Sequence, residues 1–103
     1  MRVDAFTVNV PTAGTRVQLH TGGGLNLRDK ILWVRFRGRP LNTGTVYVGI
    51  SDVAATNGWS LENGDDAGLT LDFRAYGGSV EAQDFWVDAA TNADKVEVAV
   101  ILE

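Results

Sequence analysis

The chain has no cysteine and only one histidine, His20, among its 103 residues. A chain without cysteine has no disulfides, no thiolate metal ligands and no cysteine nucleophile. A single histidine excludes the histidine pair of the metalloproteases and a zinc site built from several histidines. These absences remove several kinds of catalysis from consideration, and they favour synthesis in a reducing compartment.

Long apolar runs are absent as well. No stretch approaches the ~20 apolar residues of a membrane-spanning helix, and no apolar signal segment follows Met1. No window of helical length carries apolar residues at three-and-four spacing. We therefore expect no membrane partner and no helical fold.

The chain consists instead of short alternating segments. With 45% hydrophobic residues, a chain of this length can fill one core, so we predict a single domain over residues 1–103. The predicted strands cover residues 6–10, 17–19, 31–37, 46–50, 69–73, 85–87 and 95–102, with a short apolar step at 59–61. Seven or eight short strands predict an all-β fold, a single antiparallel β-sandwich that is jelly-roll-like or, alternatively, immunoglobulin-like.

Turn signals separate these strands. Asn42-Thr43-Gly44, Asn57-Gly58 and Asn63-Gly64 are typical of tight turns, because Asn and Gly tolerate the required backbone angles. The segment from Thr21 to Gly24 predicts a flexible loop. Residues 88–94 are polar or small and predict another turn.

Alternation also assigns side chains to faces. We expect Leu19 and Ile50 to face the core, and His20 to lie on the surface. On the third strand the predicted inward side chains are Leu32, Val34 and Phe36, and the outward ones are Trp33, Arg35 and Arg37.

No group of residues predicts catalysis. No Ser lies in a nucleophile elbow, and the glycines after Thr21 lack the Gly-Lys-Ser/Thr of a phosphate-binding loop. The carboxylates of Asp65 and Asp66 are sequence neighbours, so on a strand they would point apart. A calcium site is conceivable from Asp52, Asn63, Asp65 and Asp66, but the spacing matches no calcium loop. We predict that the protein is not an enzyme and needs no metal and no cofactor.

The charge is unevenly distributed along the chain. The net charge is −4, yet residues 1–51 hold seven basic and two acidic side chains, while residues 52–103 hold two basic and eleven acidic ones. The halves either form two charged poles or interleave in the sandwich. Basic residues near the third strand are Arg28, Lys30, Arg35, Arg37 and Arg39. A pI near 4.8 argues against a nucleic-acid partner, because such binders usually carry a net basic domain.

Outward aromatic and guanidinium groups are the most informative feature. Trp, Tyr and Arg dominate the energetics of protein interfaces. The candidate interface residues are Trp33, Arg35, Arg37, Tyr47 and Trp86. A protein interface explains them best. The alternatives are a second small core beneath a loop, and a nucleic-acid or sugar site.

The order of motifs resembles small structural proteins of tailed bacteriophages. The resemblance begins with Ala13-Gly14-Thr15 and Val17-Gln18-Leu19. It continues from Asn42-Thr43-Gly44 through Val46 to Gly49, and then through Asn57-Gly58. It ends with Phe85 to Thr91 and a Val-rich last strand. Together these motifs span most of the chain.

This resemblance implies a virion protein, a capsid decoration or cement protein with a β-sandwich fold. Its implied partner is the major capsid protein, on the capsid exterior, and self-association as a trimer is implied too. Synthesis would take place in the host bacterial cytoplasm. The alternative is a tail- or fibre-associated module that binds host-surface glycans through Trp33, Tyr47 or Trp86.

Overall fold

The computed structural model describes residues 1–62 and 68–103, with Tyr76 described by its backbone alone. The strands in these residues are β1 (Arg2–Val10), β2 (Val17–Gln18), β3 (Lys30–Gly38), β4 (Val46–Gly49), β5 (Trp59–Leu61), β6 (Leu69–Asp72), β7 (Val80–Glu81), β8 (Trp86–Ala89) and β9 (Asp94–Leu102). Three short 3₁₀ helices join them: η1 (Leu19–Gly22), η2 (Arg74–Tyr76) and η3 (Ala82–Asp84). The predicted all-β fold is confirmed.

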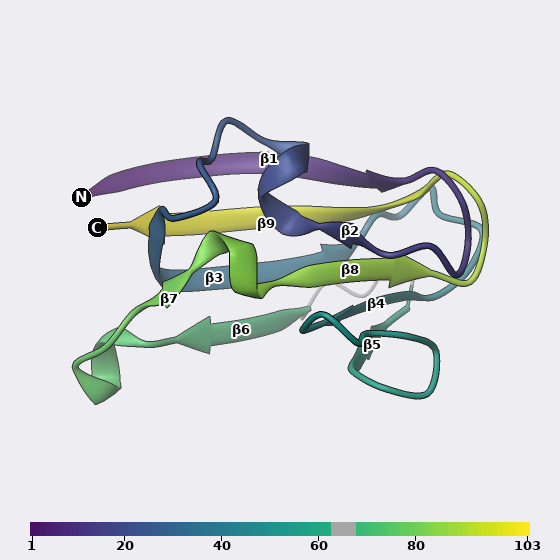
Figure 1. The fold of residues 1–103 in the computed structure, drawn as a ribbon. Coiled ribbons are helices and arrows are strands. Elements are labelled where there is room, and N and C mark those ends of the chain that lie inside the picture. The colour runs from purple at the N-terminus through teal and green to yellow at the C-terminus, as the bar shows by residue number, and fades with distance from the viewer. Residues whose placement is uncertain (63–67) are drawn as a thin grey trace.

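The strands form two antiparallel sheets (Figure 1). Sheet A has the order β1-β9-β3-β6, and β7 also pairs with β3. Sheet B has the order β2-β8-β4-β5. The first and last strands pair along nine residues, from Arg2 opposite Leu102 to Val10 opposite Asp94, so the chain ends lie side by side.

The topology is that of a jelly roll. The chain passes between the sheets at almost every connection: β1 and β3 lie in sheet A, β2 and the β4–β5 hairpin in sheet B, and the pattern repeats through β6, β8 and β9. Two four-stranded sheets connected in this way define the jelly roll. An immunoglobulin sandwich instead pairs its first two strands within one sheet. The jelly-roll form of the prediction is therefore the one found.

The core lies between the sheets and is built from the inward side of each alternating strand. Phe36 of β3 and Phe85, which precedes β8, meet edge to face with ring centroids 5.4 Å apart. Phe73 contacts Phe85 from the end of sheet A. Small valines fill the rest of the space, since Val8 and Val10 of β1 and the valines of β4 and β9 are almost fully buried. The predicted inward positions Val34 and Phe36 are confirmed.

Several local predictions are wrong at strand ends. Ile31 is fully buried while Leu32 is only half-buried, because the pairing of β3 with β9 shifts register between Ile31 and Trp33. A bulge of this kind reverses which side chain faces the core. β4 ends at Gly49, so Ile50 is 62% exposed instead of inward.

The second predicted strand is also shorter than expected. β2 holds only two residues, and the chain then enters η1, which buries Leu19 by a 3₁₀ turn. The glycines that follow are packed closely rather than merely flexible. A Cβ on Gly22 would lie 2.6 Å from Val8 Cγ2, and a Cβ on Gly23 would lie 2.6 Å from Phe6 Cγ. These glycines let the segment lie directly against β1.

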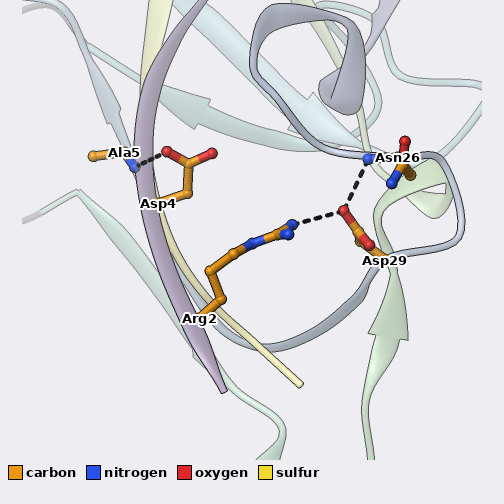
Figure 2. Close-up of polar contacts among 5 residues, drawn as sticks. All are labelled: Arg2, Asp4, Ala5, Asn26 and Asp29. Atoms are coloured by element: carbon orange, nitrogen blue, oxygen red, sulfur yellow. Dashed lines mark hydrogen bonds and ion pairs between the residues drawn. The ribbon is translucent and has the colours of Figure 1, made fainter.

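Polar contacts fasten the next loop to β1, as Figure 2 shows. Arg2 Nη2 donates to Asp29 Oδ2 over 3.0 Å, and the backbone N–H of Asn26 donates to the same oxygen over 2.8 Å. Nearby, Asp4 accepts from the backbone N–H of Ala5. The Arg2–Asp29 ion pair is exposed, so its main role is to set the path of residues 26–29 into β3.

The 42–44 turn is held by two buried polar side chains. Asp94 accepts from the backbone N–H groups of Thr43 and Gly44, over 2.9 and 2.8 Å. Asn42 donates to the Lys95 carbonyl and accepts from its backbone N–H, over 2.7 and 2.8 Å. The predicted turn is confirmed, and the structure shows that the start of β9 anchors it.

The two differently charged halves interleave. In sheet A, β1 and β3 come from the first half of the chain, and β9 and β6 from the second half lie beside them. Arg37 of β3 therefore pairs with Glu97 of β9, and Lys30 lies opposite Glu81 of β7. The arrangement favours interleaving over two charged poles.

Candidate binding surfaces

Three of the predicted interface residues share the outer face of sheet A. Trp33, Arg35 and Arg37 alternate along β3, point away from the core and are half-buried. Arg37 Nε and Nη2 both donate to Glu97 Oε1, over 2.9 and 2.6 Å. This contact ties the guanidinium to the neighbouring strand β9, next to a shallow depression of about 190 Å³ lined by Arg35, Arg37, Glu97, Val98 and Ala99.

Strand register places apolar side chains beside Trp33. Ile101 of β9 lies directly opposite Trp33, and Val3 of β1 lies opposite Ile101 on its other side. The next row repeats the arrangement, with Arg35, Ala99 and Ala5 as neighbours. Val3 is 74% exposed. We call the outward residues Val3, Ala5, Trp33, Arg35, Arg37, Ala99 and Ile101 the apolar face of sheet A.

A fixed ion pair borders this face. Asp72 of β6 lies opposite Trp33. Arg74 donates to both Asp72 oxygens, with Nε 3.0 Å from Oδ1 and Nη2 3.1 Å from Oδ2. The side-chain hydrogen bond from Arg74 lowers the pKa of Asp72, and the same contact raises the pKa of Arg74.

Tyr47 and Trp86 lie on the opposite face of the molecule, so the prediction that they extend the Trp33 surface is wrong. β3 and β4 are consecutive strands, but they belong to different sheets. Tyr47 of β4 and Trp86 of β8 instead share the outer face of sheet B, because Tyr47 lies opposite Asp88, two residues beyond Trp86. The five predicted residues therefore form two separate surfaces.

A loop covers part of the outer face of sheet B. Val53 is 1% exposed, yet it lies outside the main core. A Cβ on Gly49 would lie 3.1 Å from Val53 Cγ2, which shows that Val53 packs over the outward side of β4. The loop thus covers Gly49 with Val53, while the predicted interface residues Tyr47 and Trp86 on this sheet stay half-buried.

Sequence reasoning missed Asp88. The predicted turn 88–94 placed it in solvent, but it belongs to β8 and is 4% exposed. Its Oδ1 accepts from the backbone N–H groups of Gly14 and Ala89, over 3.0 and 2.8 Å. Only its position directly after an apolar run hinted at a strand. It lines a hollow of about 520 Å³ on the outer face of sheet B.

His20 is not the strand surface residue that was predicted. It lies in η1 and is half-buried. Its Nδ1 is buried and has no hydrogen-bond partner within the described part of the chain. Of the candidate calcium ligands, Asn63, Asp65 and Asp66 lie outside the described residues, and Asp52 is exposed. Across residues 1–62 and 68–103, no three acidic or histidine side chains are grouped as a metal site.

Comparison with protein-family models, curated proteins and solved structures found no match. None of the helices in the described residues is long and apolar enough to cross a membrane.

Proposed function

We propose that this protein is a bacteriophage capsid decoration protein that binds the outer surface of the major capsid lattice and stabilises the head. The apolar face of sheet A is the observation that carries the proposal. The ordered motifs from Ala13 to the last strand support the class of protein, and the face supplies a surface on which such a protein can dock.

The chemistry of the face suits a protein partner. A large aromatic side chain, Trp33, lies beside Ile101 and is flanked by guanidinium groups on the same strand. Protein interfaces combine an apolar centre with a polar rim, and their strongest contacts come from Trp, Tyr and Arg. Here Val3 and Ile101 extend the apolar centre, and Arg37 with Glu97 forms the rim.

The size of the face is sufficient as well. The molecule measures 35 × 24 × 24 Å. One broad side is therefore comparable with the ~800 Å² that each partner buries in a standard interface. A decoration protein requires a rigid scaffold with a large contact area rather than a deep cleft, and a two-layer sandwich provides both.

Self-association is part of the proposal, as a trimer on the lattice. β1 is a nine-residue strand at the edge of sheet A and, within residues 1–62 and 68–103, pairs with β9 alone. Its other edge leaves backbone groups that can pair with a different surface of a second copy, the head-to-tail contact that a ring of three requires. Sedimentation equilibrium of the purified protein should give a trimer; a monomer at all concentrations would reject self-association without affecting the docking proposal.

Docking can be tested with expanded, undecorated capsids of the phage that encodes the chain. The wild-type protein should co-sediment with these capsids and raise the temperature at which they disrupt. Trp33→Ala should weaken binding by about 2 kcal/mol, which is roughly 30-fold in Kd, if Trp33 is a hot spot.

Trp59→Ala is the matched control, because Trp59 is 47% exposed on β5 of the opposite sheet. It should bind like the wild type. Absence of wild-type binding at near-physiological salt would reject the proposal. Equal losses of binding affinity in the two variants would show that the protein does not contact the capsid specifically through the apolar face.

A further inference from the structure

The hollow on the outer face of sheet B has a defined floor and two walls. Tyr47 and Asp88, which are cross-strand neighbours, form the floor. Ala13, Gly14 and Arg16 form one wall, and Val53, Ala54 and Ala55 of the covering loop form the other. Its volume of about 520 Å³ falls within the range of small-molecule sites. It faces away from the apolar face of sheet A.

Asp88 presents an unused acceptor to this hollow. Both backbone N–H groups that bind Asp88 use Oδ1. Oδ2 has no hydrogen-bond or ion-pair partner among the described residues, and it is not one of their buried unpartnered atoms, so it is open to solvent in the hollow. A carboxylate oxygen that is open to solvent and bound by no protein group is free to accept a hydrogen bond from a ligand.

The structural role of Asp88 does not account for this oxygen. Of the two Asp88 oxygens, only Oδ1 binds the 12–15 turn, through the Gly14 N–H. Asn92 Oδ1 also holds this turn, because it accepts from the Ala13 N–H over 2.7 Å. The turn is therefore held without Oδ2, and Oδ2 remains available to a ligand.

The other lining groups indicate what kind of ligand fits. Arg16 is exposed at the rim and supplies donors, while Asp88 supplies an acceptor. Because the two charges are opposite, the hollow as a whole favours a neutral ligand over a cation. The Tyr47 ring and the alanine methyl groups offer apolar surface to the C–H face of such a ligand. A ring that carries several hydroxyl groups and has one apolar face matches this combination of donor, acceptor and apolar surface.

We propose that the hollow between residues 13–16 and 53–55 is a carbohydrate-binding site that takes a neutral hexose unit of a polysaccharide. Asp88 Oδ2 accepts from sugar hydroxyls, Arg16 donates to sugar oxygens, and the ring of Tyr47 forms the apolar platform. The site is independent of the docking function, because it lies on the other sheet.

An NMR titration of the wild-type chain tests the site directly. The probes are glucose, galactose, mannose and N-acetylglucosamine, added separately. The backbone amide signals of Gly14 and Ala89 should shift with at least one sugar, because both N–H groups bind the Asp88 carboxylate. The amide of Gly77, far along the chain in the η2 turn, should not move.

Two variants identify the groups involved. Asp88→Asn should weaken binding about tenfold or more, since an ionised acceptor makes the stronger hydrogen bond. Because Asp88 also holds the 12–15 turn, this variant risks a folding defect. Arg16→Ala alters only an exposed side chain and should also weaken binding, with an unchanged melting temperature.

Arg39→Ala is the matched control outside the hollow and should bind like the wild type. Absence of a shift with every sugar would overturn the proposal. So would a shift of Gly14 and Ala89 with methylguanidinium but not with sugars, because the hollow would then take a cationic protein side chain. Failure of capsid binding would leave the sugar titration unaffected, so the two proposals can fail separately.

Discussion

At the scale of single residues, the buried polar side chains account for the geometry of the turns. Among the described residues these are Asn42, Asp88 and Asp94, each of which bonds to backbone groups distant in sequence. A buried polar group is tolerated only when it is hydrogen-bonded. These residues therefore join β8 and β9 to turns that lie some 50 or more positions away in the chain.

Asp94→Ala should destabilise the fold substantially. The change removes the acceptor of two part-buried hydrogen bonds, those donated by the backbone N–H groups of Thr43 and Gly44. We expect a loss of about 2–4 kcal/mol in the free energy of unfolding, measured by urea denaturation. Asp52→Ala, at an exposed aspartate, should change it by less than about 0.5 kcal/mol. Similar urea midpoints for the two variants would show that Asp94 does not anchor the 42–44 turn.

The Asp72–Arg74 pair makes a prediction about pH. Arg74→Gln removes the side-chain hydrogen bond that lowers the pKa of Asp72, so this pKa should rise toward its ordinary value. A folded-state pKa below the unfolded one stabilises the protein above the unfolded pKa, and that stability is lost as the pH falls through the folded value. Carboxyl-carbon NMR titration measures the shift; Arg16→Gln, on the other sheet, should leave it unchanged.

At the scale of elements, strand interiors follow the sequence pattern and strand ends do not. The alternation in β3 predicts that Val34 and Phe36 are buried, as found. The register shift near Ile31 and the 3₁₀ turn at Leu19 depend on neighbouring strands, which alternation does not encode. η2 ends at Gly77, which lies in the left-handed region and bonds back to the Arg74 carbonyl.

Alanine substitutions at two glycines compare the cost of backbone strain with the cost of steric overlap. Gly68 before β6 and Gly77 after η2 have positive φ values of 59° and 70°. A Cβ on Gly68 would clash with the carbonyl oxygen of Phe36, while a Cβ on Gly77 would meet no atom within 4 Å. Gly77→Ala should cost about 1–2 kcal/mol, and Gly68→Ala about 2–5 kcal/mol because overpacking is added.

Thermal and urea unfolding of these two variants provide the measurement. Equal destabilisation would mean that the chain before β6 relaxes away from Phe36, and that the contact does not define the path into β6.

At the scale of the whole molecule, the jelly roll creates two outward faces with different chemistry. The apolar face of sheet A is flat and carries Trp33, and the outer face of sheet B holds the hollow with Asp88. Our two proposals assign protein docking to the first and sugar binding to the second. A protein docked through sheet A would leave the hollow directed away from its partner.

The interleaved charges predict how capsid binding responds to salt. Raising the salt from about 0.1 M to about 1 M shortens the screening length from about 10 Å to about 3 Å. Docking through an apolar centre should weaken by less than about tenfold over this range in co-sedimentation. A much steeper loss would show that opposite charged poles carry the binding, in conflict with the strand order of sheet A.

The sequence alone determined most strand interiors and which of their side chains face inward, because a strand places alternate residues on opposite sides regardless of its neighbours. The tertiary structure decided which strands are neighbours, and this depends on contacts between residues far apart in the chain. Consecutive strands β3 and β4 thus carry Trp33 and Tyr47 to opposite faces, while Asp88 meets the 12–15 turn across 74 positions. Both candidate surfaces are products of that long-range pairing.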